Sequence, residues 1–371
     1  MKKLGFGTMR LPYFGDDAGN IDTEQYKKMI DVFMAKGFTY FDTAYMYCNG
    51  ESERALKTCL VDRYPREAYT VTTKLTFMAK DLEDAERIFN DQLAKTGLTY
   101  FDYYWLHNVN HNSLEKIFDK YDCWSWLIDK KEKGLTKHIG FSFHDTPELL
   151  DEVLTKHPEI EFVQLQLNYL DWEAENVQSH KCYDVCVKHG KKVIVMEPVK
   201  GGDLANVDDK VTELFKAYDP NLSVASWAVR FAASLDNVYM VLSGMSTLQQ
   251  VEDNTSYMED FKPLTEEEIE MCFKAAKIID ETKPIKCTGC SYCTEGCPMS
   301  IKIPEWFKFY NKFVNYKEKT TRKAFLDRFL SFNKDIGDLD SCLQCGQCES
   351  VCPQHLPIIE NLKAVNEELK K

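Results

Sequence analysis

Two stretches toward the C-terminal end of the sequence each hold four cysteines within eleven residues. They read "CTGCSYCTEGCP" from Cys287 to Pro298 and "CLQCGQCESVCP" from Cys342 to Pro353. The shared spacing, C-x2-C-x2-C-x3-C-P, is typical of segments that bind [4Fe–4S] clusters, because thiolates are the soft ligands that such clusters need. A pair of zinc sites is the alternative, although zinc motifs usually offer two cysteines per turn. We therefore expect two [4Fe–4S] clusters.

In bacterial ferredoxins with two clusters, the fourth cysteine of each run ligates the other cluster. By that rule the eight cysteines form two ligand sets. The sets are Cys287, Cys290, Cys293 with Cys352, and Cys342, Cys345, Cys348 with Cys297. The segment between the runs, residues 298–341, is longer than in the smallest ferredoxins and has a helical pattern. It predicts an α-helical ferredoxin arrangement.

The other six of the fourteen cysteines lack this spacing, and we expect them to be packing residues. They are Cys48, Cys59, Cys123, Cys182, Cys186 and Cys272. Cys48 differs only in its position, because it directly follows Tyr47 and could line a substrate pocket.

A second group of chemically capable residues is spread over the first third of the chain. Asp42 and Tyr47 lie in "FDTAYMYCNGESE", Lys74 in "YTVTTKL" and His107 in "FDYYWLHN". A tyrosine with a pKa of about 10 is a poor proton donor at neutral pH unless a nearby cation favours the phenolate. Lys74 can supply that cation and Asp42 can hold it in place. His107 can then donate a hydrogen bond to a carbonyl oxygen that gains charge during hydride addition, while Tyr47 delivers the proton.

The elements that must position these residues are short apolar or β-branched runs that alternate with helical patterns. The expected strands are Leu4–Thr8, Thr39–Asp42, Tyr69–Lys74, Asp102–His107, His138–Phe143, Phe162–Gln166, Lys192–Met196 and Val238–Leu242. Amphipathic segments such as Leu82–Ala94 and Asn176–His189 lie between them. This alternation predicts a parallel sheet covered by helices. Eight such units in about 260 residues favour an α/β fold with a closed (β/α)8 TIM barrel over an open doubly wound sheet.

The barrel gives the four residues a common location. In TIM barrels the chemistry lies at the C-terminal ends of the strands. Asp42, Lys74 and His107 end successive expected strands, and Tyr47 follows the first of them in the next loop. Each residue alone has a structural explanation, but their joint position favours an active site. Aromatic residues such as Tyr45, Tyr104 and Trp105 are expected to make its mouth partly apolar.

The segments "LGFGTMRLP", "FDTAYMY…GESE", "TTK" and "LHN" resemble the aldo-keto reductase family over essentially the whole chain. With the two cysteine runs, the sequence looks like the subgroup of that family with a C-terminal ferredoxin-like domain. The resemblance implies that Asp42, Tyr47, Lys74 and His107 form the catalytic tetrad, with Tyr47 as general acid. It also implies a nicotinamide nucleotide bound in extended form across the barrel mouth.

Carried over residue by residue, the resemblance places the nucleotide contacts in four segments. They are Ser142 and Gln164 at the carboxamide, Gly201 and Gly202 at the pyrophosphate, Gly244, Met245 and Ser246 around the phosphates, and Gln250 and Asn254 at the adenine end. Met196 stands where many members stack a tyrosine on the nicotinamide. The last loop lacks the Lys or Arg that usually holds the 2′-phosphate of NADP, so NADH and NADPH both remain open.

Composition narrows the class of protein. The net charge is −13, and residues 286–371 hold 13 Lys and Arg against 11 Asp and Glu, which leaves −15 for residues 1–285. This acidic main body disfavours nucleic-acid binding. With no apolar run of membrane-spanning length and no signal-peptide pattern, we expect a cytoplasmic protein without a membrane span. The basic aromatic stretch 306–332 is a candidate partner or membrane surface, but its spacing favours packed helices.

We expect three parts: a barrel over 1–262, a connecting helix or linker over 263–285 and a dicluster domain over 286–371. The favoured function is NAD(P)H-dependent reduction of a small-molecule carbonyl substrate, or the reverse alcohol oxidation. In this favoured function the clusters exchange electrons with a partner such as a ferredoxin. Purely structural clusters, or an electron-transfer module with residual barrel catalysis, are the alternatives. Because nicotinamides transfer electron pairs and clusters single electrons, a bound flavin is a further candidate cofactor.

Overall fold

The computed structural model describes residues 2–15, 17–175, 177–287, 289, 291–352 and 356–371. The chain forms two compact units, each described by itself below. They comprise Met1–Ala205 with Phe215–Phe273, and Asn206–Leu214 with Lys274–Lys371.

The first unit is built around a closed barrel of eight parallel strands that pair in sequence order, with β8 returning to β1. The strands are β1 (Leu4–Gly7), β2 (Tyr40–Asp42), β3 (Thr70–Leu75), β4 (Phe101–Val109), β5 (Thr136–Phe143), β6 (Phe162–Gln166), β7 (Lys192–Met196) and β8 (Val238–Gly244). The predicted (β/α)8 barrel is therefore confirmed. Every expected strand is present, although β4 continues two residues beyond His107.

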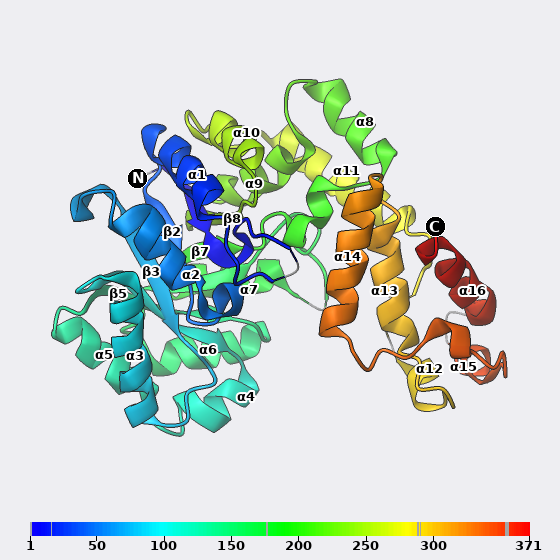
Figure 1. Ribbon diagram of the computed structural model, residues 1–371, viewed down its shortest axis with the longest axis horizontal. Coiled ribbons are helices and arrows are strands. Elements are labelled where there is room, and N and C mark those ends of the chain that lie inside the picture. The colour runs from blue at the N-terminus through cyan, green and yellow to red at the C-terminus, as the bar shows by residue number, and fades with distance from the viewer. Residues whose placement is uncertain (1, 16, 176, 288, 290, 353–355) are drawn as a thin grey trace. The chain divides into compact units, whose positions relative to one another are not determined.

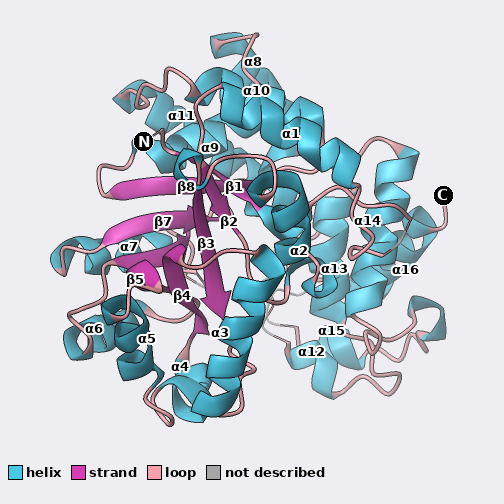
Figure 2. Cartoon of the chain, turned by 60° about the vertical axis from the view of Figure 1, so that its left-hand side comes forward, coloured by secondary structure: helices cyan, strands magenta, loops and turns pink. Residues whose placement is uncertain are grey.

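Helices surround the strands, as Figure 2 shows. In this unit they are α1 (Thr23–Ala35), α2 (Ser52–Leu56), α3 (Leu82–Thr96), α4 (His111–Ser113), α5 (Cys123–Glu132), α6 (Pro147–Lys156), α7 (Ser179–Lys188), α9 (Val224–Ser234) and α10 (Leu248–Met258). Short 3-10 or π segments are η1 (Thr8–Arg10), η2 (Tyr47–Gly50), η3 (Lys57–Val61), η4 (Arg66–Ala68), η5 (Leu114–Phe118) and η6 (Lys200–Ala205). Helices α8 (Asp209–Tyr218) and α11 (Glu266–Glu281) have residues in both units.

Local chemistry determines where the helices begin and end. At α3, the Asp81 side chain accepts a hydrogen bond from the Asp84 backbone N–H, which satisfies one of the unpaired donors of the first turn. The helix ends at Gly97, whose φ of 70° is a left-handed conformation that glycine adopts without steric cost. The helix therefore runs two residues past the predicted end at Ala94.

Strand alternation separates the aromatic residues of β4 into two layers. Trp105 belongs to a buried cluster with strand residues such as Tyr40, whereas the Tyr104 hydroxyl donates to Gln92 Oε1 on α3 at 2.6 Å. Both side chains are shielded from solvent. The prediction that Tyr104 and Trp105 line the mouth of the barrel is therefore wrong, because one fills the interior and the other packs under a helix.

The second unit is helical. Its elements are α12 (Tyr292–Glu295), α13 (Ile303–Phe313), α14 (Lys319–Phe332), η7 (Leu339–Ser341), α15 (Gln347–Ser350) and α16 (Ile358–Leu369). Figure 1 shows α13 and α14 in orange and α16 in red. The helical content between the two cysteine runs agrees with the predicted α-helical arrangement.

The aromatic stretch 306–332 packs mainly as predicted. Trp306 and Phe309 are buried in the core of this unit, and the Phe309 ring stacks on Phe329 with centroids 4.1 Å apart. Phe332 is the exception, since 78% of its surface is exposed. In the part of the chain that the structure describes, we find no helix with the length and apolar content to cross a membrane.

Candidate functional site

A buried ion pair lies at the C-terminal ends of β2 and β3. The Lys74 ammonium donates to Asp42 Oδ1 at 2.6 Å and to the Thr43 carbonyl oxygen at 2.7 Å. The second carboxylate oxygen of Asp42 accepts from Gln164 Nε2 at 3.4 Å. Both charged side chains are almost completely shielded from solvent. The lysine is therefore held in one place by two acceptors, one of them charged.

Tyr47 lies beside this pair, in the short segment η2 that follows β2. The Lys74 Nζ atom is 5.0 Å from the centroid of the Tyr47 ring. The centroids of the Tyr47 and His107 rings are 5.8 Å apart, and the two rings are arranged edge to face. The next residue, Cys48, has a left-handed backbone with a φ of 52°. Its thiol donates to the Thr8 carbonyl oxygen at 3.4 Å, and burial raises its pKa. Cys48 is thus a buried thiol bonded to the backbone, with no thiolate at neutral pH.

His107 is the fourth member of the group. Its Nδ1 atom is buried and has no hydrogen-bond partner among the described residues. Burial, and then the charge of Lys74 and the neighbouring His144, lower the pKa of His107 to about 3. The imidazole is therefore neutral at physiological pH, with one N–H to donate. A buried polar atom without a partner suits a site that a polar ligand completes.

The electrostatics keep Tyr47 protonated and Lys74 charged. Burial raises the pKa of Tyr47 above its ordinary value, and the Lys74 charge opposes that effect only in part. Burial by itself lowers the pKa of Lys74, but its neighbours Asp42 and Tyr47 outweigh burial and leave this pKa raised. The site consequently offers a phenol that holds its proton beside a fixed cation, the combination that general acid catalysis needs.

The residues expected at the carboxamide lie beside the ion pair. Ser142 on β5 and Gln164 on β6 are direct neighbours in the strand register, and both are buried. Ser142 Oγ accepts from the Asn108 backbone N–H at 2.7 Å. The structure thus brings Ser142, Gln164 and Asp42 to one end of the barrel.

The residues expected at the phosphates lie in the loops after β7 and β8. Gly201 and Gly202 in η6 have φ angles of 69° and 110°, a backbone region that glycine favours. Gly244 ends β8 and is exposed, whereas the Met245 side chain is completely buried.

The two residues expected at the adenine end are engaged within the protein. Gln250 Oε1 accepts from the Ser246 backbone N–H at 2.7 Å and forms a capping box with Thr247 at the start of α10. Asn254 Nδ2 donates to Ser243 Oγ at 2.7 Å. These side chains shape the β8 loop by their own hydrogen bonds, a role that the sequence pattern did not indicate.

Arg10 is a residue that sequence reasoning missed. It ends η1, directly after β1, and its side chain passes close to both Gly201 and Gly244. The signal was present in "LGFGTMRLP", where a cation follows the first strand, but only barrel closure places β1 next to β8.

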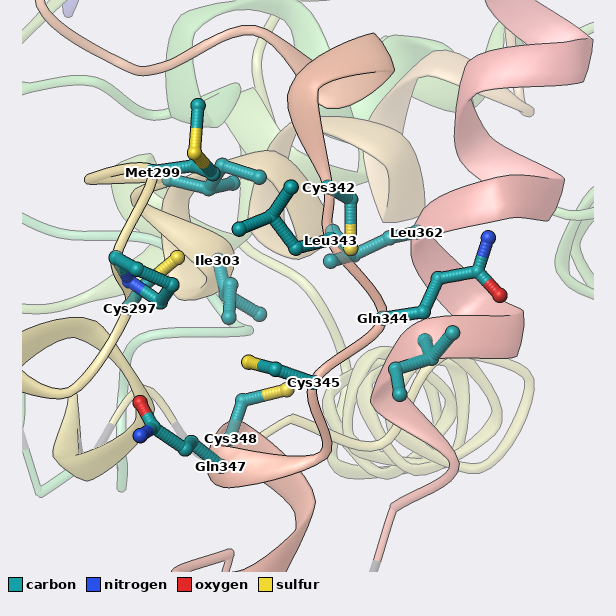
Figure 3. A pocket seen from close by; sticks show the side chains of 13 residues that line it. Cys297, Met299, Ile303, Cys342, Leu343, Gln344, Cys345, Gln347, Cys348 and Leu362 are labelled. Carbon is teal, nitrogen blue, oxygen red and sulfur yellow. The ribbon is translucent and has the colours of Figure 1, made fainter.

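The second unit contains a pocket lined by cysteines from both runs. Cys297 from the first run meets Cys342, Cys345 and Cys348 from the second around an empty space of about 340 Å³ that is partly open to solvent, as Figure 3 shows. This is the set that the ferredoxin rule groups together. Four soft thiol donors around one space match the chemistry that a [4Fe–4S] cluster requires.

The other ligand set is described only in part. Cys293 is buried, and Cys287 and Cys352 pack partly buried against the same core. The Gly289 backbone N–H donates to Cys287 Sγ at 3.4 Å. Cys290 lies outside the described residues. Among the residues that the structure does describe, no group of three or more Cys, His, Asp or Glu side chains is arranged to hold a single metal ion.

The two cysteine runs repeat the same local backbone at an offset of 55 residues. Gly289 and Gln344 are left-handed, and so are Ser291 and Gly346, each of which precedes a short helix. Within each run the fourth cysteine donates its backbone N–H to the residue three before it, at 3.2 Å for Cys297 and 3.3 Å for Cys352. Two such matching loops indicate two equivalent binding segments.

Two family models match the chain. Residues 3–277 match the aldo/keto reductase family, and residues 286–356 match the 4Fe-4S dicluster domain. The second match favours iron–sulfur clusters over the zinc alternative.

Individual relatives are similar to parts of the chain. An aldo-keto reductase of Mycolicibacterium vanbaalenii is 26% identical over 251 residues, which are 66% of this chain and 81% of that protein. NADH-quinone oxidoreductase subunit I 2 of Symbiobacterium thermophilum is 25% identical over 96 residues, 25% of this chain and 34% of that protein. A solved aldo-keto reductase of Klebsiella pneumoniae in complex with NADPH has a TM-score of 0.58 at 16% identity, covering 73% of this chain and 90% of that chain. This last similarity is one of fold.

Proposed function

Because this chain belongs to the aldo/keto reductase family of oxidoreductases and carries a C-terminal 4Fe-4S dicluster domain, we propose that it reduces a small carbonyl compound with NADH or NADPH, or oxidises the alcohol in reverse. The observation that carries the proposal is the buried pair of Lys74 and Asp42 beside Tyr47. A fixed cation next to a protonated phenol at the end of a barrel is suited to protonating a carbonyl oxygen.

Each residue has a defined part in this reaction. When bound, the reduced nicotinamide supplies the hydride to the carbonyl carbon. Tyr47 gives its proton to the carbonyl oxygen, and Lys74 stabilises the phenolate that remains until solvent returns a proton. Neutral His107 donates a hydrogen bond to the same oxygen without adding charge. Asp42 positions Lys74 and does not itself exchange a proton.

Ser142 and Gln164 are proposed to hold the carboxamide, with Gly201, Gly202, Gly244, Met245 and Ser246 along the phosphates and Gln250 and Asn254 shaping the adenine end. Met245 can act only through its backbone, because its side chain is buried. The Klebsiella pneumoniae protein binds NADPH on the same fold, which supports a nicotinamide nucleotide here without deciding between NADH and NADPH. The proposal does not include a bound flavin.

We assign the two clusters to Cys287, Cys290, Cys293 and Cys352, and to Cys342, Cys345, Cys348 and Cys297. Such clusters supply one-electron transfer when bound. Cys345 is exposed and Leu343 beside it is 63% exposed, so this site lies at a surface that a redox partner can approach. This favours electron exchange with a ferredoxin-type partner over a purely structural role.

The proposal is tested by anaerobic assays of the purified protein. NADH and NADPH oxidation is followed with a panel of aldehydes and ketones, and each nucleotide is then titrated while cluster absorbance is recorded, with dithionite as the control. Carbonyl-dependent oxidation supports the barrel chemistry, and its absence with every substrate and both nucleotides contradicts it. Bleaching by a nicotinamide indicates that the two units form one redox chain, whereas bleaching by dithionite alone indicates clusters that serve a separate partner or the fold.

A further inference from the structure

Barrel closure brings Arg10 to the loops that the proposed function assigns to the nucleotide phosphates. Gly7, at the end of β1, pairs with Gly244, at the end of β8. Arg10 follows three residues later, at the end of η1. The Ser246 hydroxyl donates to the Arg10 carbonyl oxygen at 2.7 Å, which attaches the backbone of Arg10 to the β8 loop. Arg10 is therefore a fixed part of this edge of the barrel.

Distances to two glycines show where the Arg10 side chain lies. A Cβ atom built on Gly244 would lie 3.3 Å from Arg10 Cδ and 3.5 Å from its Cβ and Cγ. A Cβ atom built on Gly201 would lie 3.1 Å from Arg10 Nη2. The aliphatic part of Arg10 thus passes over Gly244, and one edge of its guanidinium reaches Gly201 in the loop after β7.

The charge of Arg10 suits this position. The β8 loop from Gly244 to Gln250, "GMSTLQQ", contains no Lys or Arg. A dinucleotide brings two negative charges in its diphosphate, and a phosphate without a cationic partner binds less well. A guanidinium presents five N–H donors in a planar fork that matches phosphate oxygens, so it can hold a protein acceptor and a phosphate at the same time.

We propose that the Arg10 guanidinium binds the diphosphate of the nicotinamide dinucleotide. The inference rests on the proposed function. It assigns Arg10 to the diphosphate and not to the 2′-phosphate, because the guanidinium lies at Gly201 whereas only the aliphatic part lies at Gly244. NADH and NADPH share the diphosphate, so Arg10 serves both and does not select between them.

The test is direct binding of NADH and NADPH to the holoprotein under anaerobic conditions, measured by nicotinamide fluorescence without a carbonyl substrate. Arg10→Met is expected to raise Kd for both nucleotides by a similar factor of about 10- to 100-fold. Reduced nicotinamide mononucleotide lacks the diphosphate, so its Kd is expected to change less than about 3-fold. Arg87→Met is the matched control, since Arg87 lies on α3 and pairs with Asp84 at the surface.

A second variant keeps the charge and moves the side chain. Gly244→Ala places a methyl group against the Arg10 stem, and a smaller rise in both Kd values is expected. Unchanged Kd values in folded Arg10→Met overturn the inference alone, and so does a loss confined to NADPH, which would assign Arg10 to the 2′-phosphate. If the wild-type protein binds neither nucleotide, the proposed function fails and the inference with it.

Discussion

The Nζ atom of Lys74 lies 2.6 Å from Oδ1 of Asp42, and both side chains are shut off from water. Water cannot replace either partner of this buried ion pair, so the pair keeps its geometry. The Lys74 ammonium of this pair lies beside the Tyr47 ring. The position of the ion pair therefore affects the pKa of the phenol that we assign as proton donor.

Removing the Tyr47 hydroxyl should abolish the proposed proton transfer while leaving nucleotide binding intact. For Tyr47→Phe we expect kcat for carbonyl reduction to fall about 10²- to 10⁴-fold, the contribution typical of general acid catalysis. Iron content and Kd for the nucleotide should equal those of the wild type. Tyr218→Phe, at an exposed tyrosine, is the control. Full turnover by Tyr47→Phe would show that another group donates the proton.

Breaking the buried pair should destabilise the barrel. Lys74→Met leaves the Asp42 carboxylate buried without its cation, and we expect a loss of about 3–5 kcal/mol in the free energy of unfolding. Adding Asp42→Leu should recover much of that loss without restoring activity. Lys133→Met, which removes an exposed pair with Asp129, should leave the free energy of unfolding nearly unchanged. Urea denaturation of the four proteins measures these differences, and equal values for Lys74→Met and Lys133→Met would contradict the argument.

His107 should make the protein less stable in acid. Its pKa is about 3 in the folded protein against an ordinary 6.5, so the unfolded chain binds more protons between these values. The favourable contribution of His107 to the free energy of unfolding is complete above pH 6.5. It is lost as the pH falls toward 3, by at most about 1.4 kcal/mol per pH unit. His107→Gln should therefore show a shallower decline in stability over this window. Parallel curves for variant and wild type would mean that His107 titrates normally.

His107 should not affect the pH dependence of activity near neutral pH. Since the imidazole is already neutral, kcat/KM for reduction should show no inflection between pH 5.5 and 7.5, the window around an ordinary histidine pKa. A steady-state pH profile checks this. An inflection near pH 6.5 that disappears in His107→Gln would assign a charged histidine to the reaction.

The cysteine pocket predicts a selective loss of one cluster. Cys345→Ser removes one of four thiols around the pocket, so iron and acid-labile sulfide per chain should fall by about half if the other cluster is retained. Cys182→Ala, at a buried cysteine on α7, is the control and should leave iron content unchanged. Undiminished iron in Cys345→Ser would remove Cys345 from the ligand set.

Alanine substitutions at two glycines should measure separately the cost of steric crowding and the cost of a left-handed backbone conformation. A Cβ on Gly140 in β5 would lie 2.4 Å from both the Phe162 carbonyl oxygen and the Trp105 ring, and backbone cannot move aside cheaply. We expect Gly140→Ala to cost about 3 kcal/mol in the free energy of unfolding. Gly190→Ala meets open space and pays only for its left-handed φ of 66°, about 1 kcal/mol. Equal costs would show that the barrel adapts around Gly140.

The sequence by itself determined the barrel, the cluster domain and the residues most capable of chemistry. The strand pattern located all eight strands because apolar runs are a local property, and strand ends of a barrel converge on one mouth. The cysteine runs were recognisable because each supplies its ligands within one short segment. Asp42 and Lys74 were expected to meet, and they do.

Only the tertiary structure decided the properties that depend on contacts between distant segments. Arg10 reaches Gly201 and Gly244 because the barrel closes. The low pKa of His107 and the hydrogen bonds of Gln250 and Asn254 follow from burial and packing. Sequence reasoning placed Tyr104 and Trp105 at the mouth, whereas strand alternation turned them elsewhere. A residue's neighbours across the fold set its charge state and its partners, and no local pattern contains them.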